Sequence, residues 1–304
     1  MNVLLTGVTG YVGSRLAPRL LAEGHSVRGL SRNPEAAQFD FPVLPGDAVS
    51  GAGLEAALEG VDVAYFLIHS MEASPTGSFA ARDHAAAENF ARAAQAAGVW
   101  RIVYLGGLLP VDGPLSAHLA SRLDVEQTLL AATPASVAFR ASIVIGARSR
   151  PFRFLVRLVE RLPVLPMPSW RTKRTTPVDE RDMIEMLVRA ARNQQISGLA
   201  LDVGGPEEVT YRELIERIRD ALLIGRPTVG LGRLTATPIA SRVAAVVAHE
   251  DYELIGPLME SLATDLLAGG TRAAELLGVR LHSLDAAIEH ALGEWEATEP
   301  LAAR

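Results

Sequence analysis

The sequence contains no cysteine and only one lysine, Lys173, among its 304 residues. Without cysteine, the chain has no disulfides, no thiol catalysis and no cysteine-ligated metal or iron–sulfur centre. Aromatic residues make up only 5% of the chain, and there is no run of about 18 consecutive apolar residues. We therefore expect no membrane span. Because Met1-Asn2 lead directly into a strand-like run, we also expect no signal peptide.

Charge and size narrow the class of protein further. The formal net charge of −6 gives no electrostatic support for binding nucleic acid. A hydrophobic fraction of 49% and a charged fraction of 21% are typical of a globular protein that buries a large core. We expect a cytoplasmic monomer or homodimer whose partner is a small-molecule substrate.

A glycine-rich segment is the most informative feature present. Residues 6–13 read TGVTGYVG and directly follow the apolar run 3–5. The first glycine allows a tight turn, the second lets backbone N–H groups approach a diphosphate, and the third lets a helix pack close to the strand. A second strand-like run follows at 26–31. The pattern predicts a dinucleotide site with contacts at Gly7, Thr9, Gly10, Tyr11, Val12 and Gly13.

The first half of the chain alternates between strand-like and helical patterns. Strands are predicted at 2–6, 26–31, 42–45, 61–68, 100–105 and 136–145, and helices at 11–23, 51–59, 78–97 and 115–132. Such alternation builds right-handed βαβ units with helices on both faces of a parallel sheet. We therefore predict an α/β fold: a doubly wound Rossmann sheet of six or seven strands, in an NAD(P)-binding domain spanning 1–150.

After Gly146 the regular alternation of strand-like and helical patterns gives way to mainly helical patterns. We predict a smaller, mainly helical C-terminal lobe over 151–304 that caps the substrate, with strands near 171–205 returning to the sheet. Helices are predicted at 151–162, 177–192 and 210–223 and through most of the last eighty residues, and strands at 171–175 and 199–203. The proline-rich loop 163–168, Trp170 and the apolar segment 231–247 are candidates for a lid. Arg171 and Arg174 either hold a substrate anion or face solvent.

The end of the second strand bears on the choice of cofactor. NAD-preferring sites place an acidic residue about 20 positions past the glycines to hold the ribose hydroxyls. Here the strand ends at Ser31-Arg32, and the nearest acid is Glu35. Since a guanidinium pairs with a 2′-phosphate and stacks on adenine, Ser31 and Arg32 favour NADP(H).

The spacing TGxTGxxG resembles the extended and atypical short-chain dehydrogenase/reductase superfamily. That resemblance implies further cofactor contacts at the ends of the later strands. They are Asp47 and Ala48, where an adenine contact and a plain turn are equally supported, then Leu67, Ile68, His69 and Ser70, and finally Leu105, Gly106 and Gly107. Val178-Asp179-Glu180-Arg181-Asp182 and Val203-Gly204-Gly205-Pro206 extend the likeness to about residue 223.

The Tyr-x-x-x-Lys pair that carries the chemistry in the standard superfamily is absent. None of the five tyrosines is followed four positions later by lysine. His118 and Arg122 stand where the tyrosine and lysine belong, and Leu105-Gly106-Gly107 lacks the expected serine. The pattern around them resembles an NAD(P)H-binding, NmrA-like subgroup that includes reductases, epimerase-like proteins and redox sensors.

Two interpretations of His118 and Arg122, on the helix predicted at 115–132, remain open. In the first, His118 donates a proton and Arg122 anchors the nicotinamide ribose or stabilises an oxyanion. In the second, the pair only steadies the helix or contacts the cofactor. His69 is a further candidate proton donor. The favoured function is an NADPH-dependent reductase of a small carbonyl, quinone or enone compound. The alternatives are a non-catalytic NADP(H) sensor and an epimerase-like enzyme that keeps its cofactor bound.

Overall fold

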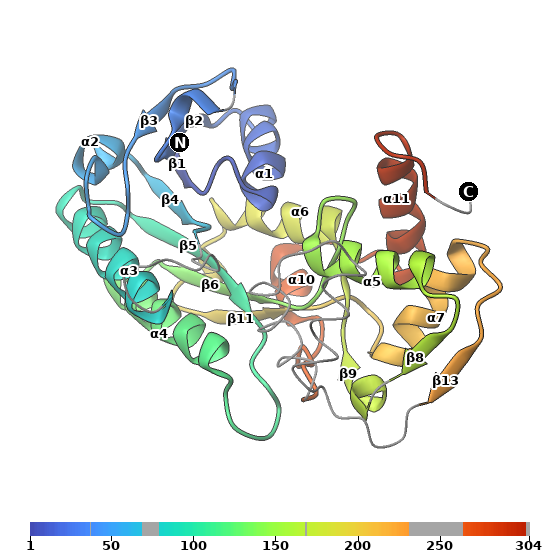
Figure 1. The fold of residues 1–304 in the computed structure, drawn as a ribbon. Coiled ribbons are helices and arrows are strands. Elements are labelled where there is room, and N and C mark those ends of the chain that lie inside the picture. Colours follow the sequence, from blue (N-terminus) through green and yellow to red (C-terminus); the bar gives the residue numbers. More distant parts are fainter. Residues whose placement is uncertain (37, 69–78, 168, 231–263, 302–304) are drawn as a thin grey trace.

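A seven-stranded parallel sheet forms the centre of the molecule (Figure 1). The computed structural model describes residues 1–36, 38–68, 79–167, 169–230 and 264–301. The strand order is β11-β6-β5-β4-β1-β2-β3. The strands are β1 (Asn2–Thr6), β2 (Ser26–Ser31), β3 (Val43–Pro45), β4 (Val63–Phe66), β5 (Arg101–Gly107), β6 (Val137–Ala141) and β11 (Ala200–Val203). The strand order reverses between β1 and β4, and in such sheets a crevice for ligands opens at that point.

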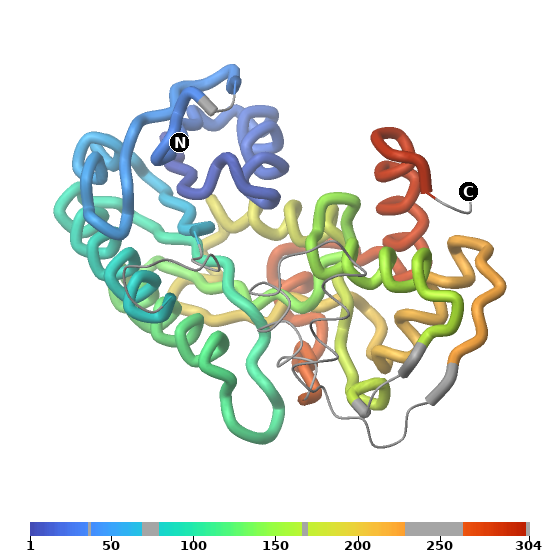
Figure 2. Tube along the Cα trace, in the orientation of Figure 1, coloured from blue at the N-terminus to red at the C-terminus, as the bar shows by residue number. Residues whose placement is uncertain are grey.

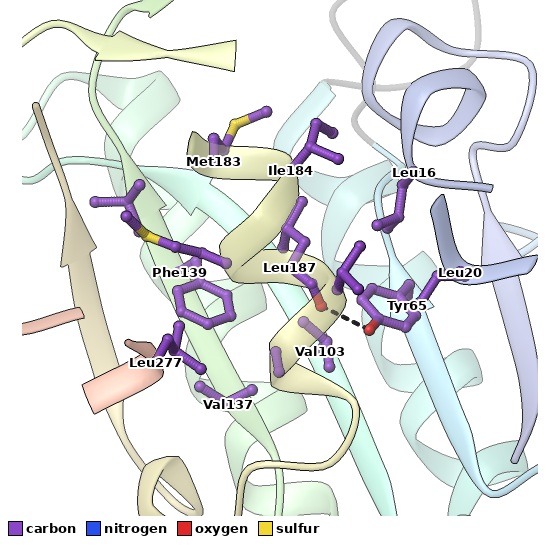
Figure 3. Close-up of a cluster of buried hydrophobic side chains, with 14 of the residues drawn as sticks. Leu16, Leu20, Tyr65, Val103, Val137, Phe139, Met183, Ile184, Leu187 and Leu277 are labelled. Atoms are coloured by element: carbon purple, nitrogen blue, oxygen red, sulfur yellow. Dashed lines mark hydrogen bonds between the residues drawn. The ribbon is translucent and has the colours of Figure 1, made fainter. Parts of the chain in front are cut away.

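Helices cover both faces of the sheet. On one face lie α1 (Tyr11–Ala22), α6 (Glu180–Ala190) and α10 (Arg272–Leu277), and on the other lie α2 (Leu54–Leu58), α3 (Phe79–Ala96) and α4 (Ala117–Ala132). Figure 3 shows the core beneath α6, where the Tyr65 hydroxyl donates to the carbonyl of Leu187 at 2.8 Å. The doubly wound Rossmann architecture is therefore confirmed.

Besides the two apolar clusters on the faces of the sheet, a third is formed in the C-terminal part of the chain. The segments that form it lie to the right in Figure 2. It is formed mainly by α5 (Arg150–Arg161), α7 (Tyr211–Ala221) and α11 (Leu284–Glu296), together with Trp170. Three two-stranded pairs accompany it: β7 (Val144–Ile145) with β10 (Val178–Asp179), β8 (Leu165–Met167) with β13 (Thr228–Gly230), and β9 (Arg174–Thr175) with β12 (Val209–Thr210). The 3-10 helices are η1 (Pro34–Ala36), η2 (Ser169–Thr172) and η3 (Gln194–Ile196).

Three predicted elements differ clearly from the structure. The strand predicted at 136–145 is divided, since the Ser142 amide donates to Val203 and the chain then leaves the sheet to pair with β10. The helix predicted from 177 begins at Glu180, because Asp179 accepts a hydrogen bond from the amide of Arg181 as its N-cap. The strand predicted at 171–175 is divided, since residues 171–172 end η2 and only Arg174–Thr175 forms β9.

Other predictions for the second half match the described residues in part. The helix predicted at 210–223 is present as α7 and begins with a capping box of Thr210 and Glu213, and the strand predicted at 199–203 is present as β11, beside β6 in the sheet. The division of the chain at residue 150 stays a prediction. The lid candidate 231–247 and residue 168 lie outside the described residues. Among the described residues, no helix is both long enough and apolar enough to cross a bilayer.

Candidate functional site

The glycine-rich turn between β1 and α1 is tightly packed. Gly7 has φ +66°, and a Cβ at this position would lie 2.9 Å from the carbonyl oxygen of Leu67. A Cβ at Gly13 would lie 2.3 Å from the carbonyl oxygen of Gly7. Because these neighbours are backbone atoms, they cannot move aside. The turn therefore requires glycine at both positions, as the sequence pattern implied.

The first turn of α1 has no capping side chain. Its N-cap is Gly10, and the turn contains no acidic residue. Among the described α-helices, four have side-chain caps, from Ser116, Asp179, Thr210 and Ser283, whereas α2, α5 and α10 lack one as α1 does. The leading amides of α1 are therefore left for another acceptor, and an anion at a helix N-terminus is favoured by the helix dipole. The residues present fit the diphosphate of a dinucleotide.

Residue Thr6 was missed in the sequence analysis and joins the two strands that flank the switch point. Its hydroxyl donates to the carbonyl of Tyr65 at 3.0 Å and accepts from the amide of Leu67 at 3.2 Å. It therefore fixes the end of β4, where Leu67 and Ile68 lie half-buried. Its signal was its place at the start of the TGxTGxxG pattern. His69 and Ser70 lie outside the described residues.

The ends of β2 and β3 carry the residues predicted to contact the adenosine half. Arg32 is exposed, and no ion pair from it to another described residue is found. The Ser31 hydroxyl accepts from the amide of Asn33 at 3.2 Å. Asp47 Oδ1 accepts from the amide of Val49 at 3.0 Å, so the plain turn is present. Ala48 is buried, and its carbonyl accepts from the side-chain amide of Asn89. An adenine contact by the other oxygen of Asp47 stays a prediction.

The two glycines after Leu105 have different environments. A Cβ at Gly106 would lie 2.9 Å from the ring of Tyr104, which is buried and whose hydroxyl donates to the carbonyl of Arg122. A Cβ at Gly107 would have only an ordinary contact, 3.7 Å from Leu119. Packing therefore excludes a side chain at 106 but leaves room for one at 107. A serine could therefore stand at 107 but not at 106.

His118 and Arg122 lie one turn apart on α4, as predicted. His118 is half-buried in the first turn, with its ring 6.3 Å from that of Phe79. Burial, with the nearby Arg122 guanidinium, lowers the pKa of His118 from 6.5 to about 4. The imidazole is therefore neutral at pH 7, which disfavours it as an imidazolium proton donor in the free protein. Arg122 is 8% exposed.

A buried ion pair holds α4 against the sheet. Glu126 is 4% exposed and accepts two hydrogen bonds from Arg140 of β6, at 2.8 and 2.6 Å. The two parallel bonds fix the orientation as well as the distance of this pair. Together with Tyr104, the pair sets the position of the helix face that carries His118 and Arg122.

A buried hydroxyl cluster lies just beyond the end of β6, and the sequence analysis missed it. The hydroxyls of Ser142 and Thr175 lie 3.0 Å apart, and Tyr211 bonds to Thr175. Burial raises the pKa of Tyr211 to about 12, so its proton is held at neutral pH. No local motif marks the cluster, because its members are 33 or more positions apart.

Of the two alternatives left open for Arg174, contact with a substrate anion is not supported, and the side chain is about half exposed to solvent. Its guanidinium pairs with Asp265 at 2.8 Å and also with Glu208. A cation that already pairs with two carboxylates has little attraction left for a substrate carboxylate or phosphate. No local pattern marks this pairing, because Asp265 lies 91 positions away from Arg174 in the sequence.

Comparison with known proteins identifies the family of this chain. Residues 7–142 match the family described as NAD(P)H-binding. The chain is 30% identical over 233 residues to the (4-alkanoyl-5-oxo-2,5-dihydrofuran-3-yl)methyl phosphate reductase of Streptomyces griseus, covering 74% of each chain. It is 25% identical to the ceramide reductase of Caulobacter vibrioides, covering 90% of this chain and 88% of that one. The chain also spans 27% of the length of uncharacterized mycobacterial proteins to which it is 27% identical.

Solved structures share the fold. The UDP-glucose 4-epimerase of Thermotoga maritima has a TM-score of 0.75 at 14% identity, covering 98% of this chain and 99% of that one. MoeE5 in complex with UDP-glucuronic acid and NAD has a TM-score of 0.72 at 20% identity, with the same coverage. The chain belongs to the NAD(P)H-binding family within the extended and atypical short-chain dehydrogenase/reductase superfamily.

Proposed function

We propose that this protein is an NADPH-preferring reductase of a small carbonyl or conjugated enone compound. The observation that carries the proposal is the pair of relatives named as reductases, each aligned over most of both chains. The name of the Streptomyces protein describes an alkanoyl group on an oxo-dihydrofuran ring, a conjugated carbonyl of the predicted kind. The glycine turn and the uncapped start of α1 support dinucleotide binding at the switch point.

The preference for NADP(H) rests on the end of β2. No acid stands there to hold the ribose hydroxyls, and the exposed Arg32 side chain is available for a 2′-phosphate. The remaining proposed contacts are those at the ends of β3, β4 and β5. NADPH, when bound, supplies a hydride. The chain's own residues must then orient the substrate and provide a proton.

The cofactor preference is tested by titrating purified protein with NADPH and with NADH. Arg32→Ala should weaken the binding of NADPH by about 1.5–3 kcal/mol and leave the binding of NADH nearly unchanged. Arg28→Ala is the matched control, because Arg28 lies on the same strand with its guanidinium donating to the carbonyl of Glu59. Equal affinity of the wild type for both dinucleotides would reject the preference.

A non-catalytic NADP(H) sensor is the second candidate. It is favoured by the absence of the Tyr-x-x-x-Lys pair and by the lowered pKa of His118. Screening NADPH oxidation against carbonyl, quinone and enone panels separates the two functions. If His118 donates the proton, His118→Phe should lower kcat by about 10²–10⁴-fold with NADPH affinity unchanged. No turnover on any panel, with dinucleotide binding intact, would favour the sensor.

A further inference from the structure

A carboxylate from the second half of the chain is bonded to the glycine-rich turn. Glu180, the first residue of α6, accepts a hydrogen bond from the hydroxyl of Tyr11, the first residue of α1. Tyr11 directly follows Gly10, so its backbone N–H belongs to the uncapped first turn. The side chain of this residue is held by Glu180, while its amide remains available to an anion.

The contact between Tyr11 and Glu180 is largely buried, and the backbone at Gly146 packs against it. The Glu180 side chain is 10% exposed, and its other oxygen lies 2.9 Å from Nε of Arg15. A Cβ at Gly146 would lie 2.2 Å from the Tyr11 hydroxyl and 2.3 Å from the Glu180 carboxylate. The backbone at Gly146, directly after β7, therefore lies in close contact with both Tyr11 and Glu180. Burial and the adjacent carboxylate raise the pKa of Tyr11, so the hydroxyl keeps its proton and remains a donor.

The same network reaches the C-terminal helix. Arg15 also pairs with Glu294 of α11, so its guanidinium bridges α6 and α11. One turn further along α1, Arg19 pairs with Glu185 of α6, and the two helices lie side by side (Figure 1). The interface between α1 and α6 thus contains one ion pair at the glycine turn and a second, more exposed pair away from it.

We propose that Glu180 is a positioning residue for the diphosphate-binding turn, which it holds through Tyr11 without touching the dinucleotide. This inference rests on the proposed dinucleotide site. The diphosphate is common to NADPH and NADH, so loss of the contact weakens both dinucleotides by the same factor. Arg32→Ala, in contrast, acts on the 2′-phosphate and weakens NADPH alone.

The test compares dinucleotide affinity with stability in Tyr11→Phe, which removes only the hydroxyl. Isothermal titration calorimetry on folded protein should show NADPH and NADH weakened equally, by about 5- to 30-fold. Glu180→Gln keeps an acceptor for the hydroxyl and should lose less affinity than Glu180→Ala. The double variant Tyr11→Phe/Glu180→Gln should bind little worse than Tyr11→Phe, because Glu180 acts on the turn through the Tyr11 hydroxyl.

Glu185→Gln is the matched control, since it breaks the second ion pair of the same helix interface. It should leave both affinities within twofold of the wild type. The inference is overturned if Tyr11→Phe lowers the Tm but leaves both affinities unchanged, or if Glu185→Gln weakens binding as much. A loss confined to NADPH would also overturn it. A wild type that binds neither dinucleotide would reject the proposed function instead.

Discussion

Protonation of His118 offers a direct test of how this site differs from the standard superfamily. Burial and Arg122 lower its pKa from 6.5 to about 4, a change of roughly 2.5 units. At about 1.36 kcal/mol per unit, protonating this ring costs roughly 3.4 kcal/mol more in the folded protein than in the unfolded chain. Solvent screening at a half-buried ring reduces this to about 2–3 kcal/mol.

The sign of the effect on stability follows from this depressed pKa. Above pH 6.5 the ring is neutral in both states and has no effect on the pH dependence. As the pH falls from 6.5 towards 4, the unfolded chain takes up a proton that the folded protein does not. The free energy of unfolding therefore decreases over this window, and His118→Phe should remove about 2–3 kcal/mol of that decrease.

Two-dimensional NMR of the imidazole Cε1–H groups measures the titration directly, with His118 assigned by the loss of its signal in His118→Phe. We expect the His118 resonance to titrate near pH 4. His84 serves as the internal control, because its ring nitrogen lies 2.6 Å from Asp124 and this carboxylate raises its pKa above 6.5. A His118 pKa of 6 or more in the free protein would refute this account and restore the imidazolium as a donor at neutral pH.

Two further predictions concern packing. Gly13→Ala should abolish dinucleotide binding in titration calorimetry, because the new Cβ would overlap the carbonyl of Gly7. Gly293→Ala in α11, where the space around the residue is open, should bind normally and raise the free energy of unfolding in urea by about 0.5–1 kcal/mol. Arg101→Met should lose about 3–5 kcal/mol in the same assay, because it leaves three buried backbone carbonyls and the Ser197 hydroxyl without the donor that satisfies them. A loss below 1 kcal/mol would contradict this reasoning.

Short-range patterns predicted the nucleotide half of the fold well. The runs 2–6 and 26–31 became β1 and β2 with those bounds, because apolar alternation and glycine positions are local properties. The predicted contacts in the described part of the chain lie in the glycine turn, at the ends of β2 to β5 and on α4. They share one edge because the carboxyl ends of parallel strands do so.

What the sequence did not predict depends on pairs far apart in the chain. The bond between Tyr11 and Glu180 joins residues 169 positions apart, and the partner of Arg174 at Asp265 is equally invisible to a local pattern. The start of α6 was displaced for the same reason, since β10 pairs with β7 before the helix begins. Even the pKa of His118 depends on burial that only the folded chain supplies.

Around α4, the helix expected at the superfamily site is present and firmly packed, but the side chains that carry the standard chemistry are absent. Glu126, Arg140 and Tyr104 hold the helix against β5 and β6, yet no tyrosine or lysine stands on its facing turn. Gly107 lacks a hydroxyl even though a side chain would fit there. If this protein reduces a carbonyl, the proton must come from a group other than the tyrosine of the standard superfamily. The Ser142 hydroxyl, which is bonded to Thr175, lies just after β6 at the same edge of the sheet. Ser142→Ala is thus the variant to set beside His118→Phe once a substrate is found. A donor should show a lowered kcat, unchanged NADPH affinity and an altered pH dependence of kcat, whereas a hydroxyl that only packs should not alter the pH dependence.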